Sequence, residues 1–341
     1  MLLFACVLRA ESTPKAALLI LSKSAQTLSI VDPSTLKVLG RIPSGPDPHE
    51  VVASADGKTA YISNYGGGVY NTITVVDLVQ RKALPAIDLG ALHGPHGLQF
   101  AGGKVLFTAE TNKVIGSYDP ADQKIDWILG TGQNRTHMIF VSPDLTRMIT
   151  SNVSAATMTI IERNVARRGP PQGGPPQNGA QQGRRPAGPP PVDWDETVVP
   201  VGRGAEGFDV TPDGKELWAA NAQDGTVSIL DIAAKKVTET LSASVMGANR
   251  LKFTVDGKLA FISTLSGPDL TIYDVATRKV VKRIKIGRGA AGILMHPDRT
   301  RAYVACTPDD YVVVVDLKSL EVVAHLDAGK QPDGLAWAVH P

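Results

Sequence analysis

The strongest constraint on the fold is a repeat of about 42 residues that recurs along almost all of the 341-residue chain. Each complete copy holds a short apolar strand, a turn such as "SADGK" or "TPDGK", a second strand, and a third strand that ends in an acidic residue. A turn of this kind between two apolar runs predicts a β-hairpin. The ends of the third strands mark seven copies: Asp32, Asp77, Asp119, Glu162, Asp231, Asp274 and Asp316.

Four short strands in a unit of this length are typical of one β-propeller blade. The first unit lacks an inner strand, whereas the last residues, "KQPDGLAWAVHP", supply a lone one. If that strand pairs into the first blade, the ring closes and leaves no open sheet edge. We therefore predict an all-β fold: a single domain over 15–341, a seven-bladed β-propeller with four antiparallel strands per blade, in which the carboxyl-terminal strand completes blade 1.

The second strands carry a further pattern. "AYISNYG", "MITSNVS" and "LWAANAQ" place Asn64, Asn152 and Asn221 at one slot of the repeat. They resemble the Tyr-Val-Thr-Asn signature of the YVTN-repeat β-propeller family. That family and its relatives include surface and periplasmic binding proteins, lactone hydrolases, a streptogramin lyase and cofactor-carrying reductase domains. The resemblance therefore implies the propeller fold and leaves the function open.

Two segments fall outside the repeat. Residues 1–14 begin "MLLFACVLRA", which predicts a signal-peptide remnant or a disordered leader, and hence a periplasmic or secreted protein. Residues 165–192 are rich in Pro, Gly and Gln and contain no acidic residue, which predicts a disordered insertion between the third and fourth strands of blade 4. Its four arginines either contact an anionic polymer or lie in a plain solvated loop.

Three histidines share one position in consecutive units, two residues before the first apolar residue of the inner strand. Around the ring this position reads His49, His96, His137, Glu206, Asn249, Ala291 and Asp333. Inner strands line the channel of a propeller, so we predict that these side chains converge at one mouth. Three imidazoles and a carboxylate suit one transition-metal ion, Zn, Cu or Fe, rather than Ca or Mg. The alternative is that they are ordinary turn and channel-lining residues.

The loops between second and third strands open on the same face, so they predict the rim of the mouth. The predicted rim or substrate-contacting residues are Asn64, Tyr65, Glu110, Asn152, Asn221 and Asn249. For the three asparagines at the repeat slot, the alternative is a strand-end hydrogen bond within the repeat. Cys306 occupies the same slot and is interpreted as a small filler.

The predicted function is metal-assisted hydrolysis, as in a lactonase, or lyase chemistry on a small molecule at the channel mouth. His49, His96 and His137 would hold the metal, and Glu206 would be a fourth ligand or a general base. Arg250 or Asp333 would orient the substrate. Two alternatives stay open: a non-catalytic scaffold that binds a peptide, glycan or surface partner, and a copper or iron redox or oxygen enzyme that uses the same ring.

The gross composition excludes several other classes. A net charge of +2 gives no strong signal for nucleic-acid binding. No apolar run is long enough to span a bilayer. No c-type haem motif and no P-loop occurs, so we expect neither haem nor a nucleotide. The expected partner is a small-molecule ligand, and the expected state is a monomer.

Overall fold

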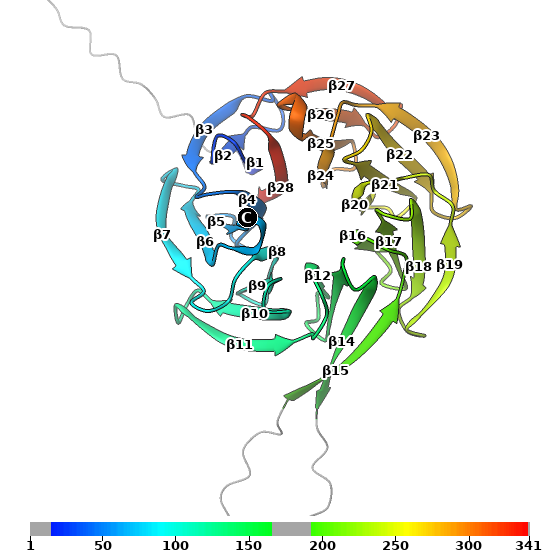
Figure 1. Cartoon of the computed structure of the whole chain (residues 1–341). Helices are drawn as coiled ribbons and strands as arrows, with labels where there is room; N and C mark the ends of the chain where they lie inside the picture. Colours follow the sequence, from blue (N-terminus) through cyan, green and yellow to red (C-terminus); the bar gives the residue numbers. More distant parts are fainter. Residues whose placement is uncertain (1–14, 166–191, 340–341) are drawn as a thin grey trace, which may run out of the picture.

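The chain folds into a closed ring of seven antiparallel sheets around a central axis (Figure 1). This computed structural model describes residues 15–165 and 192–339. Blade 1 joins the two ends of the chain, because β28 (Pro332–Val339) pairs with β1 (Ala16–Ser22), which is followed by β2 (Thr27–Val31) and β3 (Val38–Pro43). The predicted all-β propeller, its seven blades and its closure by the carboxyl-terminal strand are thus confirmed.

The other six blades each run in chain order from the axis outward. Two short 3-10 turns, η1 (Gly66–Gly68) and η2 (Thr307–Asp309), interrupt the connections. The strands are β4 (Pro48–Ala53), β5 (Thr59–Asn64), β6 (Thr72–Asp77) and β7 (Lys82–Asp88) in blade 2; β8 (Pro95–Ala101), β9 (Lys104–Ala109), β10 (Val114–Asp119) and β11 (Lys124–Gly130) in blade 3; β12 (Thr136–Val141), β13 (Arg147–Asn152), β14 (Thr157–Val165) and β15 (Val192–Pro200) in blade 4; β16 (Ala205–Val210), β17 (Glu216–Asn221), β18 (Thr226–Asp231) and β19 (Lys236–Leu241) in blade 5; β20 (Ala248–Phe253), β21 (Leu259–Thr264), β22 (Asp269–Asp274) and β23 (Lys279–Lys285) in blade 6; and β24 (Ala290–Met295), β25 (Arg301–Cys306), β26 (Tyr311–Asp316) and β27 (Glu321–Leu326) in blade 7.

The insertion leaves the ring from blade 4. Strands β14 and β15 pair along their whole length, from Thr157↔Pro200 at the mouth face to Val165↔Val192 at the opposite face, so Val165 and Val192 lie in strands. The pair projects outward from the ring in Figure 1. Residues 166–191 and the leader 1–14 lie outside the described residues, so their predicted disorder stays a prediction.

The core consists of apolar layers between neighbouring blades. Trp218 of β17 is fully buried and packs edge-on against Phe253 of β20, with 5.6 Å between ring centroids. At the closure, Leu18 and Ile20 of β1 pack in one cluster with Tyr303 of blade 7. Burial of each such side chain contributes about 1.5–3 kcal/mol, so the ring closes through side chains as well as through strand pairing.

Each inner strand carries a β-bulge at the mouth, which the sequence analysis did not predict. In blade 2, Pro48 pairs with Asn64 and Val51 with Ile62, so two residues of β4, His49 and Glu50, oppose one residue of β5. The same register shift occurs in the other six blades. A bulge re-aims the side chains that it contains. Here it directs the residue at the predicted mouth position.

Hydroxyl groups link the bulge of one blade to the next blade. Ser63 accepts a hydrogen bond from the Glu50 N–H at 3.0 Å and donates one to the His96 carbonyl at 2.9 Å. Thr108 does the same between the Gly97 N–H and the His137 carbonyl, at 2.9 and 2.7 Å. These bonds satisfy backbone groups that a bulge leaves unpaired, and they fix successive mouth residues relative to one another.

Glycine follows the mouth residue in four of the seven blades. A Cβ on Gly207 would lie 2.3 Å from the carbonyl oxygen of Asn249, and one on Gly334 would lie 2.3 Å from that of His49. For Gly97 and Gly292 the nearest backbone oxygens would lie 2.6 and 2.2 Å away. The inner strands of adjacent blades are therefore in backbone contact, which brings the mouth side chains close to the axis.

Replacing Gly207 by Ala is expected to lower the free energy of unfolding by about 1–3 kcal/mol, because the added methyl group would overpack the contact with Asn249. Gly130 of the outer strand β11 is the matched control, since no heavy atom lies within 4 Å of a Cβ built there. Urea denaturation of both variants measures the difference. A Gly207→Ala chain as stable as Gly130→Ala would contradict this account of the close contact.

Candidate active site at the channel mouth

The structure brings the three predicted histidines together at one mouth of the channel. The ring centroids of His49 and His96 are 5.0 Å apart, and those of His96 and His137 are 3.7 Å apart. With Glu206 and Asp333 they line a cavity of about 330 Å³. Equivalent positions on successive blades therefore meet, as the register predicts.

His137 is the most tightly held of the three. Its Nδ1 is hydrogen-bonded to Glu110, which also accepts a bond from the Tyr65 hydroxyl at 2.6 Å. Its Nε2 lies 3.5 Å from the Glu206 carboxylate. Burial by itself would lower the pKa of His137, but the hydrogen bond to Glu110 and the nearby negative charge of Glu206 outweigh burial and raise that pKa. His137 thus accepts positive charge readily.

Glu206 is held in its ionised form. Burial would raise the pKa of Glu206, but the close contact with His137 and its charge, together with the charges of Arg250 and Arg135, lower it to about 2. Asn249 donates a hydrogen bond to the same carboxylate at 2.9 Å. This carboxylate is therefore negatively charged at neutral pH.

His96 lies between the other two imidazoles and is kept neutral. Burial, followed by the charges of His137 and His49, holds its pKa well below the usual range. Its Nδ1 has no hydrogen-bond partner among the described residues, and the same holds for His137 Nε2. Unpaired nitrogens on buried imidazoles are unusual and call for an explanation.

His49 is flanked by groups of both signs. Its Nε2 lies 3.2 Å from Asp47, and its Nδ1 lies 3.3 Å from the Lys23 ammonium and 3.5 Å from Asp333. Lys23 in turn forms an ion pair of 2.9 Å with Asp333. The sequence analysis missed Lys23, although it occupies in blade 1 the slot that Tyr65 occupies in blade 2.

A second group that the sequence analysis missed precedes the bulge. The residue two positions before the mouth residue has a positive φ in every blade, and it is Gly in four of them. Asp47 at φ 42° and Arg135 at φ 57° adopt this strained conformation as non-glycine residues. Asp47 contacts His49, and Arg135 lies 3.7 Å from Glu110. A charged residue at a glycine slot is the signal that would have found them.

The charges around the cavity do not balance. Among the described residues that line it or bond to its lining there are five carboxylates and three permanent cations, which leaves an excess of two negative charges when the imidazoles are neutral. The carboxylates are Asp47, Glu50, Glu110, Glu206 and Asp333, and the cations are Lys23, Arg135 and Arg250.

The structure places the predicted rim residues in two groups. Tyr65, Asn249 and Arg250 line the cavity, and Glu110 lies behind Tyr65. The rim position is wrong for the asparagines of the repeat slot, which are fully buried and bonded to strand neighbours: Asn64 to Thr74 and the Ser44 carbonyl, Asn152 to Thr157 and Thr159, and Asn221 to Thr226 and Ser228. The alternative of strand-end hydrogen bonds holds for all three, because each amide is bonded to neighbours inside its blade, although the Oδ1 of Asn221 has no partner among the described residues.

The metal site stays a prediction. Within 15–165 and 192–339, no group of three or more His, Cys, Asp or Glu side chains is arranged as metal ligands. The orientation of two imidazoles explains this absence. The ring centroids of His96 and His137 are 3.7 Å apart, so the two rings pack against each other and do not surround a common point. Ligation would require at least one of the two imidazoles to rotate.

Cys306 is expected to be inert in the folded protein. It is fully buried, and burial raises the pKa of its thiol to about 12, so roughly one molecule in ten thousand carries the reactive thiolate at about pH 8. In a Cys6→Ser background, Ellman's reagent should detect no thiol in the native chain and one in guanidinium chloride. A native thiol that reacts as fast as free cysteine would contradict this prediction.

No family model and no curated protein matches the sequence. Solved structures do match. A protein of unknown function from Desulfotomaculum acetoxidans has a TM-score of 0.73 at 14% identity, over 95% of this chain and 99% of that chain. A candidate 6-phosphogluconolactonase from Bacteroides fragilis has a TM-score of 0.70 at 14% identity, over 96% and 99%. Hydrazine synthase from Kuenenia stuttgartiensis has a TM-score of 0.67 at 17% identity, over 86% and 90%.

Likeness at these identities establishes the fold alone. Membership of the YVTN-repeat family is not confirmed. In the described part of the chain, no helix has the length and apolar character of a membrane span. The chain is thus a seven-bladed β-propeller with one enzyme and one candidate lactonase among the structural neighbours named above.

Proposed function

We propose that the mouth cavity binds one transition-metal ion, Zn, Cu or Fe, and that the protein performs metal-assisted hydrolysis or lyase chemistry on a small molecule. The observation that carries this proposal is the pair of unpartnered nitrogens, His96 Nδ1 and His137 Nε2. An unsatisfied buried polar group costs about 1–3 kcal/mol. Coordination of a metal would remove that cost at both rings.

The groups behind the imidazoles support the same proposal. Glu110 bonds the Nδ1 of His137, and Asp47 lies 3.2 Å from the Nε2 of His49. A carboxylate on the far nitrogen orients a ligating imidazole and makes it a stronger donor. The excess of two negative charges around the cavity is the charge that a divalent cation would neutralise.

Glu206 fits the role of a ligand better than that of a base. With a pKa of about 2 it is too weak a base for efficient proton abstraction near neutral pH. We therefore assign it as the fourth ligand, held in place by Asn249. A bound metal would polarise a carbonyl and acidify a coordinated water. Arg250 and Asp333, which line the same cavity, would orient the polar group of the substrate.

A second candidate is a metal-free pocket that binds a peptide, glycan or other partner. One observation favours it: the Lys23 ammonium already lies 3.3 Å from His49 Nδ1, where a metal cation would be repelled. A copper or iron redox or oxygen enzyme would share the ligands of the first candidate and differ in the reaction. Export to the periplasm or medium is also part of the proposal, and cell fractionation would test it.

Metal content separates the candidates. Elemental analysis of chain purified without chelator, together with a Co²⁺ titration followed by visible absorption, reports metal binding without any assay of activity. We expect about one ion per chain in the parent, and loss of that ion in His96→Ala and His137→Ala. His93→Ala is the matched control. His93 lies in the same turn as His96 but is hydrogen-bonded to the Val69 carbonyl, so this variant should leave the metal content unchanged.

A parent chain that contains no metal and binds no Co²⁺ would reject the metal site and favour the binding pocket. Equal metal loss in His93→Ala would indicate a folding defect, which circular dichroism of the same samples would reveal. For a metal-loaded chain, turnover of lactones and esters that stops on chelation supports hydrolysis. Redox cycling of bound Cu or Fe without such turnover supports the redox alternative.

A further inference from the structure

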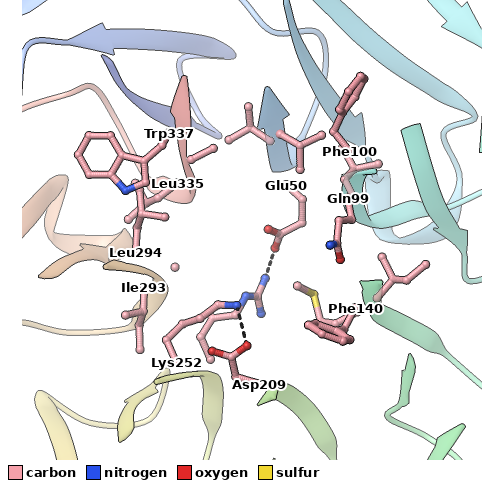
Figure 2. A pocket seen from close by; sticks show the side chains of 18 of the residues that line it. Glu50, Gln99, Phe100, Phe140, Asp209, Lys252, Ile293, Leu294, Leu335 and Trp337 are labelled. Atoms are coloured by element: carbon pink, nitrogen blue, oxygen red, sulfur yellow. Dashed lines mark hydrogen bonds and ion pairs between the residues drawn. The ribbon is translucent and has the colours of Figure 1, made fainter. Parts of the chain in front are cut away.

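A second cavity occupies the channel beneath the mouth. It has a volume of about 490 Å³, and all seven inner strands contribute to its wall. Figure 2 shows the side chains of these strands around its open centre. The two cavities share Arg250, whose guanidinium is bonded across the channel to Glu50. This ion pair separates the imidazoles above from the channel below.

The wall of the channel cavity is largely apolar and aromatic. Leu98, Ile139 and Phe208 are buried in it, and Phe140 and Trp337 are half-buried. The ring of Trp337 points away from the open centre and packs against His296 and Tyr303. Ligand pockets of about 300–1,000 Å³ with such walls bind small molecules chiefly by burial of apolar surface. The size and the lining of this cavity fall within that class.

The charged groups of the wall are paired with one another. Glu50 pairs with Arg250, and Lys252 lies 3.4 Å from Asp209, which also accepts a bond from the Phe253 N–H. Gln99 donates to the Val141 carbonyl at 3.0 Å and accepts from the Val141 N–H at 2.7 Å.

The indole of Trp337 donates to the Met295 carbonyl at 2.8 Å. None of the buried side-chain atoms without a hydrogen-bond partner in the described residues belongs to this lining. A charged ligand would therefore be desolvated in a channel whose charged lining residues are already paired, which is unfavourable.

We infer that the channel cavity is a second binding site, which takes an uncharged, apolar ring-containing small molecule. The contrast with the mouth supports this assignment: the mouth has unpartnered imidazole nitrogens and unbalanced charge, whereas the channel has paired charges and aromatic walls. The inference does not rest on the proposed metal chemistry, because its lining contains none of the three histidines.

The probe pair N-phenyl-1-naphthylamine and its sulfonated analogue 8-anilinonaphthalene-1-sulfonate tests the inference by fluorescence titration. We expect the uncharged probe to bind with a stoichiometry of one and at least tenfold more tightly than the anion. Leu294→Asp, which puts a short charged side chain into the cavity, and Ala53→Trp, which fills it, should each weaken binding of the uncharged probe at least tenfold.

Val281→Asp is the matched control, since Val281 is half exposed on the outer strand β23 and should leave binding unchanged. Circular dichroism of each variant verifies that the fold is intact. Undiminished binding in both channel variants would place the probe elsewhere and overturn the inference. Tighter binding of the sulfonate, or no binding of the uncharged probe to folded parent chain, would overturn it as well.

Discussion

Backbone contact between neighbouring inner strands is the constraint on which the rest of this structure depends. Gly207 and Gly334 leave no space for a side chain against the next blade, so the strands meet at the axis closely enough for mouth side chains to touch. The bulge then turns one residue per blade toward the mouth, and hydroxyls such as that of Ser63 tie each bulge to the following blade. Closure by β28 makes this arrangement circular.

Because the scaffold repeats, chemical difference between blades is confined to a few positions. Where a blade keeps glycine after the mouth residue, the channel stays open, and where it carries Glu50 or Arg250, the channel is crossed. Where a blade keeps glycine before the bulge, the turn is relaxed. Asp47 and Arg135 replace glycine there at the cost of about 1–3 kcal/mol of backbone strain each. Both residues reach carboxylate or imidazole partners of the mouth, which is the gain that offsets the strain.

The repeat made the fold and the ring position predictable, because blade period and register are local properties of the sequence. The Asn64 slot was misassigned in the same step, since a strand-end amide and a rim amide have the same spacing, and only packing shows that this one is enclosed. Lys23 could not be found by scanning for histidines, as it reaches His49 from another blade. The orientation of the His96 and His137 rings depends on side-chain packing, which the spacing of residues in the sequence does not determine.

The two cavities follow from one division of charge along the channel. Arg250 has to satisfy Glu50, Asn249 and the field of Glu206 at once, and it does so from the boundary between mouth and channel. Among the described residues that line the two cavities or bond to that lining, the unbalanced negative charge lies on the mouth side, where the unpartnered imidazole nitrogens are also found. Below Arg250 the charged lining residues Lys252 and Asp209 pair with each other, and the wall contains several aromatic side chains. Binding of a positively charged ligand is therefore favoured at the mouth, and binding of any charged ligand is disfavoured in the channel. The guanidinium of Arg250 separates the two sites.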